Sequence, residues 1–358
     1  MVWRVSGRRA ASPLATRLTA QLLAGEPARD PVAVAERLLA VQGQDPRGAR
    51  LAVRVRTLGS GTTAADVDHA LTDDRSLVIS WLNRGTLHLV RREDWPWLHA
   101  LTTPPLRAGS ARRLAQEGVP PADAERAVAA VERALADEGP LTREQLRERV
   151  AAAGVRTAGQ AHVHVLLAAT LRHAIVRGPM RGTRHAFALA RDWLGEEALR
   201  AVDRNRALAE LARRYLAGHG PASDRDLARW AGLPLRDARA GLSAIAPQLA
   251  QRPDDLVDLA QRPAGEDAAP LPPPRLLGAY DPLLLGWCSR EDVLGERGAG
   301  IVTANGLFRP FLLVRGRAAG LWRLEGGEVA LDPFGRLASR DAGALARDAA
   351  DVRRFLGR

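Results

Sequence analysis

Apolar residues recur every three or four positions in several stretches of the chain, and elsewhere they form short unbroken runs. The first pattern is typical of a helix with one buried face, and the second of a buried strand. Among the first hundred residues, helical periodicity covers 16–24, 31–41, 46–57 and 64–72, while 76–81 and 86–90 are β-prone runs around a glycine turn. The order predicts four helices followed by a β-hairpin.

Related orders recur twice further along the chain. Helical patterns at 122–136, 142–152 and 162–172 precede β-prone runs at 174–176 and 185–190. Patterns at 207–216, 224–230 and 235–245 precede strand-like segments between residues 248 and 259. Helix, turn, capped helix, helix and hairpin is the order of a winged helix-turn-helix. We therefore expect winged-helix units at residues 1–105, 106–200 and 201–262.

The first two predicted hairpins also share a sequence detail. Arg84-Gly85-Thr86-Leu87-His88 is matched by Arg181-Gly182-Thr183-Arg184-His185, and an Asp-Trp pair follows each at nearly the same distance. Chance remains an alternative in a chain so rich in arginine and glycine, but we interpret the match as an internal structural repeat.

The pattern changes after a proline-rich stretch at residues 262–275, which we interpret as a linker or an extended wrap. Short apolar runs at 301–303, 311–314, 320–324 and 328–331 predict strands, and periodicity at 342–355 predicts a final helix. The predicted fold class is therefore α+β: three tandem winged-helix motifs and, within residues 263–358, an antiparallel β-barrel-like module.

The positive charge of the chain indicates a polyanionic partner such as DNA. The formal net charge is +11, and all 52 basic residues are arginine. Stretches 47–56, 172–191 and 298–324 contain arginines and no acid, and they fall largely on predicted third helices and hairpins, where winged helices contact phosphates. Compositional bias toward arginine is the alternative reading. The missing lysine excludes a P-loop lysine, a kinase lysine and imine chemistry at a side-chain amine.

Other chemistry is limited by what the sequence lacks. The single cysteine, Cys288, excludes an intrachain disulfide, and we expect it to be buried and inert. His162 and His164 would lie on different sides of a helix, so we expect no metal site and no cofactor. No long apolar run or signal-peptide pattern is present, which predicts a cytoplasmic protein. With DNA as its partner we expect it to be nucleoid-associated, and the lack of an obvious dimerisation helix favours a monomer.

Gln42-Gly43-Gln44 is the most informative short segment. It lies between two predicted helices and opens onto Asp45-Pro46, where Asp45 is the expected N-cap of the next helix. Side chains two positions apart share a side in an extended segment but not in a helix. The two amides can therefore point into one space, although two solvated amides in a loop are the simpler alternative.

Four blocks of the sequence lie at residues 39–50, around the two glutamines, and at 81–90, 220–233 and 280–286. In this order they resemble the AlkZ/YcaQ family of bacterial DNA glycosylases. Together they extend over most of the chain. The resemblance implies a C-shaped protein with three tandem winged-helix motifs on a β-barrel. It also implies excision of N-alkylated purines and, for the AlkZ branch, unhooking of interstrand crosslinks.

The resemblance also implies site residues. The AlkZ branch has two glutamines around one residue as its catalytic motif, which matches Gln42 and Gln44, with Gly43 where the family has a bulkier apolar residue. Both amides would position a water, and Asp45 is either a supporting base or only an N-cap. The residues that we expect to contact double-stranded DNA carrying alkylated or crosslinked bases are Arg47, Arg50, Arg54, Arg84, Thr86, His88, Arg181 and Arg184.

Two function classes remain open on the sequence. One is a monofunctional glycosylase, without imine-based strand cleavage because no side-chain amine is available. The other is a non-catalytic winged-helix DNA-binding protein such as a transcription regulator. The arginine clusters suit both classes, whereas the paired glutamines favour the enzyme.

Overall fold

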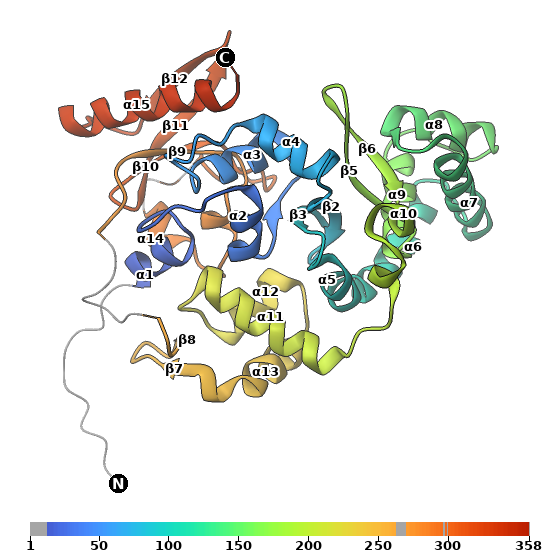
Figure 1. The fold of residues 1–358 in the computed structure, drawn as a ribbon, viewed down its shortest axis with the longest axis horizontal. Helices are drawn as coiled ribbons and strands as arrows, with labels where there is room; N and C mark the ends of the chain where they lie inside the picture. Colours follow the sequence, from blue (N-terminus) through green and yellow to red (C-terminus); the bar gives the residue numbers. More distant parts are fainter. Residues whose placement is uncertain (1–12, 263–269, 296–297, 299, 358) are drawn as a thin grey trace.

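A computed structural model describes residues 13–262, 270–295, 298 and 300–357 (Figure 1). The helices are α1 Pro13–Ala20, α2 Pro31–Leu38, α3 Pro46–Arg54, α4 Ala64–Thr72, α5 Trp95–Thr102, α6 Arg107–Gln116, α7 Pro121–Glu138, α8 Arg143–Ala152, α9 Ala161–Leu171, α10 Ala190–Leu194, α11 Arg204–His219, α12 Asp224–Ala231, α13 Leu235–Ala244, α14 Glu291–Leu294 and α15 Ser339–Phe355. The strands are β1 Val41–Gln42, β2 Leu77–Leu82, β3 Thr86–Arg91, β4 Leu141–Thr142, β5 Ile175–Arg181, β6 Arg184–Leu189, β7 Leu249–Gln251, β8 Val257–Leu259, β9 Arg275–Leu277, β10 Phe311–Val314, β11 Arg317–Glu325 and β12 Glu328–Pro333. Short 3-10 turns occupy Pro104–Leu106, Glu196–Leu199, Ala246–Gln248 and Pro282–Leu284.

Local capping signals fix the starts of several helices. Asp30 accepts a hydrogen bond from the backbone N–H of Ala33 at 2.7 Å, with proline in the first turn of α2. Thr142 and Ser223 each form a capping box, at the starts of α8 and α12. These side chains satisfy N–H groups that have no partner inside the helix. The predicted starts of these three helices are confirmed.

The first two predicted hairpins belong to one sheet. Its order is β1-β3-β2-β5-β6-β4, and all of its pairings are antiparallel. The contact between the two hairpins is the pairing of Ile79 in β2 with Arg177 in β5. The sheet therefore crosses the boundary that we predicted at residue 105, and the domain limits remain predictions.

The two matching hairpin sequences occupy similar places. Gly85 and Gly182 both lie in the turns, with φ of 79° and 60°, a left-handed conformation that glycine adopts without strain. The tryptophans that follow, Trp95 and Trp193, are buried in the same apolar core. This core also contains residues of α11, α12 and β10, so it joins the first unit to the third and to the C-terminal part.

The third predicted unit has the expected order of α11, α12, α13 and the β7–β8 hairpin. Gly232 ends α12 in a left-handed conformation, φ 68°. A Cβ at this position would lie 2.8 Å from the carbonyl oxygen of Asn83, so only glycine allows α12 to approach the β2–β3 turn this closely. Whether each of the three units is a winged helix remains a prediction.

The C-terminal part differs from the prediction. Its strands form an open four-stranded sheet in the order β12-β11-β10-β9, packed beside α15, and the described residues contain no closed barrel (Figure 1). Residues 301–303, predicted as a strand, contribute an isolated bridge between Val302 and Phe308. A sequence pattern of alternating strands does not specify whether the first and last strands meet, which is why the barrel prediction was wrong.

Three smaller predictions from the sequence can also be compared with the structure. Cys288 is exposed, so the prediction that it is buried was wrong. Residues 263–269 of the predicted linker lie outside the described part of the chain. In the described part, no helix combines the length and the apolar character that crossing a bilayer requires.

Candidate active site and nucleic-acid interface

The two glutamines lie in an extended segment between α2 and α3. Val41 and Gln42 form β1, with Gln42 opposite His88 of β3, and the N–H of Gly43 donates to the carbonyl of Leu87 at 2.7 Å. In this segment the Nε2 of Gln42 donates to the Oε1 of Gln44 at 2.6 Å. The expectation that a non-helical backbone brings both amides into one space is confirmed.

Gln42 is buried and Gln44 is exposed, so the pair connects the protein interior to the surface. Both line a cavity of about 460 Å³. Its walls come from five separate stretches of the chain, and its lining residues are Gln42, Gln44, Arg84, Thr86, Arg229, Tyr280, Leu285, Arg290, Gly306 and Phe308. We call this cavity the glutamine pocket.

One wall of the glutamine pocket is the segment after β9. The backbone of Ala279 lies against α3 at Gly48, where an added Cβ would be 2.3 Å from the Ala279 carbonyl oxygen. Tyr280 follows with a φ of 56°, and its ring lies 5.5 Å from that of Phe308. The aromatic side of the pocket therefore depends on close contact between α3 and a segment more than 200 residues later.

The opposite wall is the tip of the β2–β3 hairpin, held by α12. The Nη1 of Arg84 donates to the carbonyls of Arg229 and Trp230 at the end of α12, the first at 3.3 Å. These carbonyls have no acceptor role inside the helix, so a guanidinium can satisfy them. Arg84 thereby ties the third unit to the first at the edge of the pocket.

The glutamine pocket is strongly basic. Arg84, Arg229 and Arg290 line it, and within the described residues none of them forms an ion pair with a carboxylate. Burial, followed by the neighbouring arginines, lowers the pKa of both Arg84 and Arg290 below the usual value for arginine. Three cations that repel one another around one cavity favour an anionic ligand beside the glutamines.

Thr86 and His88 behave differently from one another. The hydroxyl of Thr86 is buried at the glutamine pocket and has no hydrogen-bond partner among the described residues. His88 is paired with Gln42 across β1 and β3, is only 3 % exposed, and donates from Nδ1 to the Thr86 carbonyl at 2.9 Å. Burial and the nearby Arg84 lower the pKa of His88 to about 3. The ring is therefore neutral and inaccessible, and the structure removes His88 from the predicted DNA contacts.

Asp45 has the capping geometry that its sequence position indicates. Its carboxylate accepts a hydrogen bond from the N–H of Arg47 at 3.0 Å, at the start of α3. It is not among the residues that line the glutamine pocket. Of the two roles open for Asp45, N-cap and supporting base, the geometry supports the N-cap.

The three arginines predicted on one face of α3 have separate environments. Arg47 is exposed, whereas Arg50 is largely buried against Asp68, with Nε 2.9 Å from the carboxylate. Arg54 is 1 % exposed and donates to Asp348 of α15 at 2.9 Å. The structure removes Arg54 from the predicted DNA contacts, because its charge is already neutralised inside the protein.

The β5–β6 turn keeps its predicted arginines at the surface. Arg181 donates to the carbonyl of Pro140 at 2.8 Å, and Arg184 lies 3.4 Å from Glu144. Both side chains are exposed. They remain predicted DNA contacts, on a different element from the glutamine pocket.

Several pocket residues were missed by the sequence analysis. Arg229, Arg290 and Phe308 were not selected, because helical or strand periodicity gives no sign that an exposed arginine or a loop phenylalanine lies beside a distant segment. Tyr280 lies within the 280–286 block that carries the family resemblance, but the sequence predicted no role for it. The block itself was the available signal for it.

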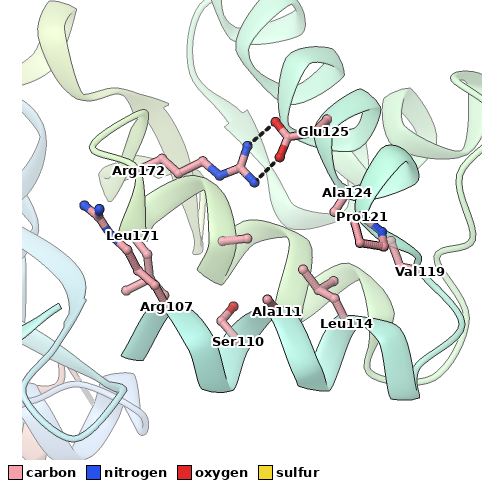
Figure 2. Close-up of a pocket in the computed structure, with 11 residues that line it drawn as sticks. Arg107, Ser110, Ala111, Leu114, Val119, Pro121, Ala124, Glu125, Leu171 and Arg172 are labelled. Carbon is pink, nitrogen blue, oxygen red and sulfur yellow. Dashed lines mark hydrogen bonds and ion pairs between the residues drawn. The ribbon is translucent and has the colours of Figure 1, made fainter. Parts of the chain in front are cut away.

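A second cavity lies far from the glutamines. It measures about 500 Å³ and lies between α6, α7 and α9, with a mainly apolar lining (Figure 2). Figure 2 shows Arg172 and Glu125 joined by two hydrogen bonds of 2.6 Å across it. It shares no lining residue with the glutamine pocket. No group of three or more His, Cys, Asp or Glu in the described residues is placed to hold a metal ion.

Comparison with known proteins identifies the family of this chain. The family described as DNA glycosylase AlkZ-like matches residues 35–355. The chain therefore belongs to the AlkZ-like DNA glycosylase family. It is 28 % identical to the interstrand DNA cross-link repair glycosylase of Streptomyces sahachiroi, over 96 % of this chain and 95 % of the relative. The solved structure of the Streptomyces sahachiroi DNA glycosylase AlkZ superposes with a TM-score of 0.77 at 27 % identity, covering 96 % of this chain and 95 % of that one.

Proposed function

We propose that the chain is a monofunctional DNA glycosylase that hydrolyses the N-glycosidic bond of N7-alkylated purines, including purines in interstrand crosslinks. Membership of the AlkZ-like DNA glycosylase family supports the reaction class. The name of the Streptomyces sahachiroi relative, an interstrand DNA cross-link repair glycosylase, supports crosslinks as substrates. The observation that carries the proposal is the hydrogen-bonded pair of Gln42 and Gln44 in a pocket surrounded by arginines.

The hydrogen bond between the glutamines leaves suitable acceptors for a water. Gln44 Oε1 uses one lone pair to accept from Gln42, and a carbonyl oxygen has a second. The Oε1 of Gln42 accepts no hydrogen bond within the described residues. A water that donates one hydrogen to each amide oxygen keeps a lone pair free to attack the sugar carbon C1′.

An N7-alkylated purine needs little acid catalysis, because it is already a cation. As the bond from C1′ to the base breaks, its electron pair returns to the base, which leaves neutral. The water oxygen bonds to C1′, and its proton passes to solvent. The dipoles of the amide oxygens also stabilise positive charge that develops on the sugar. This division of roles needs no lysine, no metal and no cofactor.

The three pocket arginines support a particular placement of the substrate. Arg84, Arg229 and Arg290 would repel a cationic base but attract phosphates. We therefore place the phosphates that flank the target nucleotide against these arginines, with the sugar facing the glutamines. Tyr280 and Phe308 offer an aromatic surface beside them.

The finer description of the fold belongs to the same proposal. We take residues 1–105, 106–200 and 201–262 as three winged-helix units that together follow a DNA duplex. The order of helices and hairpins in each unit supports this description.

The deciding experiment uses a duplex with one N7-methylguanine. The purified protein is incubated with this duplex, and free N7-methylguanine is measured by mass spectrometry. A duplex that carries a nitrogen-mustard crosslink is tested in parallel. We expect release of the base and an abasic site that breaks only after alkali. Tight binding to both duplexes without any release of base would instead support a non-catalytic DNA-binding protein.

A further inference from the structure

A second arginine-lined pocket is bordered by Pro46 and Arg47, directly after the segment that carries the glutamines. It measures about 630 Å³ and is bounded by α3 and α4 from one side and by α8 and the β5–β6 hairpin from the other. Five arginines and two acids line it: Arg47, Arg50, Arg143, Arg177 and Arg184, with Asp68 and Glu144. The pocket is therefore basic although it is built from two separate parts of the chain.

The two acids neutralise only two of these arginines. Asp68 pairs with Arg50, and Glu144 lies 3.4 Å from Arg184. Arg47, Arg143 and Arg177 have no carboxylate partner within ion-pair distance in the described residues. Three unpaired guanidiniums therefore face one cavity.

Arg177 is the most informative of the three. Its guanidinium lies 6.0 Å from the ring centre of Phe187, and its Nε is buried without any hydrogen-bond acceptor among the described residues. Burial, followed by repulsion from Arg143 and Arg50, lowers the pKa of Arg177 to about 10, so it is still charged at neutral pH. A largely buried cation without a counter-ion costs folding free energy, and an anion in the pocket would offset this cost.

The backbone adds to the positive potential. Pro46 and Arg47 belong to the first turn of α3, and Arg143 and Glu144 to the first turn of α8, and all four line the pocket. The positive ends of two helix dipoles therefore meet at the unpaired arginines.

The position of the pocket indicates which anion it would bind. Gln44 lines the glutamine pocket and Pro46 lines this one, and two residues span at most about 7 Å. A DNA strand carries one phosphate for about every 3.4 Å of axis, so adjoining pockets are one or a few phosphates apart. We propose that Arg47, Arg143 and Arg177 form a phosphate-binding pocket that holds the DNA backbone beside the nucleotide at Gln42 and Gln44. This inference rests on the proposed function for the identity of the neighbouring nucleotide.

Binding to undamaged duplex DNA tests the pocket without requiring base release. Affinity is measured by fluorescence anisotropy between 50 and 200 mM KCl for Arg143→Gln, Arg177→Gln and the double variant. Loss of one phosphate contact should reduce the slope of log affinity against log salt by about 0.9. Because all three arginines would hold the same phosphate, each single variant should lose part of this slope, and the double variant should lose more of it than either single variant. Arg143→Lys should retain most of the slope, since it keeps the charge.

The matched control is Arg29→Gln, an exposed arginine outside the pocket that already pairs with Asp30. The proposal is overturned if both pocket variants keep the wild-type affinity and slope, or if Arg29→Gln changes them equally. Because Arg143 is exposed, Arg143→Gln should fold normally, and it therefore tests the phosphate contact even if Arg177→Gln is poorly folded. A wild-type protein that releases no base but shows the expected change in slope would contradict the proposed enzyme and leave the phosphate pocket standing.

Discussion

Arg56 and Asp281 form a buried two-point ion pair that joins the residues after α3 to the segment that carries Tyr280. Nη1 and Nη2 of Arg56 each donate to one carboxylate oxygen of Asp281 at 2.9 Å, and both side chains are 0 % exposed. Arg56 also donates to the backbone carbonyl and the side chain of Gln21. The pair therefore fixes one wall of the glutamine pocket from inside the protein.

Breaking this pair should be strongly destabilising. We expect Asp281→Ala to lower the free energy of unfolding by about 3–5 kcal/mol, because the guanidinium would remain buried without its counter-ion. Replacing both partners, as Arg56→Met with Asp281→Leu, should recover much of the loss. Urea denaturation measures both effects. A change below about 1 kcal/mol for Asp281→Ala would contradict this account.

The paired glutamines should matter for chemistry and not for binding. Gln42→Ala and Gln44→Ala should each slow release of N7-methylguanine by about 10²–10⁴-fold, the range expected for a group that positions the attacking water. The dissociation constant for the damaged duplex should change little, since neither side chain is charged. Gln251→Ala, at an exposed glutamine in β7, is the matched control. If both Gln42→Ala and Gln44→Ala release the base at the wild-type rate, the assignment of these glutamines as catalytic residues is wrong.

Gly43 should tolerate a methyl group. Its φ lies outside the left-handed range, and an added Cβ would meet Leu89, Leu87 and Ile79 at 3.6–3.8 Å, which is ordinary contact. Gly43→Ala should therefore keep base release and raise the free energy of unfolding by about 0.4–1 kcal/mol. Gly48→Ala is the contrast, because its Cβ would lie 2.3 Å from the Ala279 carbonyl oxygen. Thermal denaturation measures the stability of both variants. Equal changes in stability for Gly43→Ala and Gly48→Ala would contradict the different spacing around the two glycines.

Acid should destabilise the fold through its buried histidines. Burial lowers the pKa of His88, His99, His185 and His219 to about 3, against 6.5 in the unfolded chain. Between these values the unfolded state binds protons that the folded state does not, so stability falls as the pH is lowered from 6.5 toward 3. Each histidine contributes up to about 1.4 kcal/mol per pH unit. Urea midpoints measured from pH 7.5 to 4.5 should decrease, and a constant or rising midpoint would contradict the burial of these rings.

The absence of lysine leads to a chemical prediction. An imine with the abasic sugar requires an amine, and the chain supplies no side-chain amine. Borohydride added during base release should therefore trap no covalent protein–DNA adduct by gel electrophoresis. A trapped adduct would point to the N-terminal amine and would end the description of the enzyme as monofunctional.

Much of the fold could be predicted because its signals are local. Asp30, Thr142 and Ser223 cap helices whose starts were predicted from a few neighbouring residues, and α4 lies exactly where its periodicity indicated. The paired arrangement of Gln42 and Gln44 could also be predicted, because the direction of side chains two positions apart depends only on local backbone conformation.

The parts of the fold and of the site that the sequence did not predict depend on contacts between residues that are distant in sequence. Arg54 and Arg56 were counted in a basic cluster because the neighbouring residues include no acid, but their partners Asp348 and Asp281 lie 294 and 225 positions away. Arg290 and Phe308 reach the glutamine pocket in the same way, from positions far from the glutamines in sequence. A one-dimensional charge pattern cannot distinguish an arginine that faces DNA from one that holds a buried acid.

The shared sheet has a consequence for producing pieces of this protein. All six residues of β2 are buried, and β5 covers the edge that a fragment of residues 1–105 would leave open. An uncovered apolar strand pairs readily with another chain, whereas the natural outer strands, β1 and β4, have only two residues each. Expression of the first unit alone should therefore give aggregates. Chimaeras between relatives should remain soluble only when residues 1–200 are exchanged as one piece.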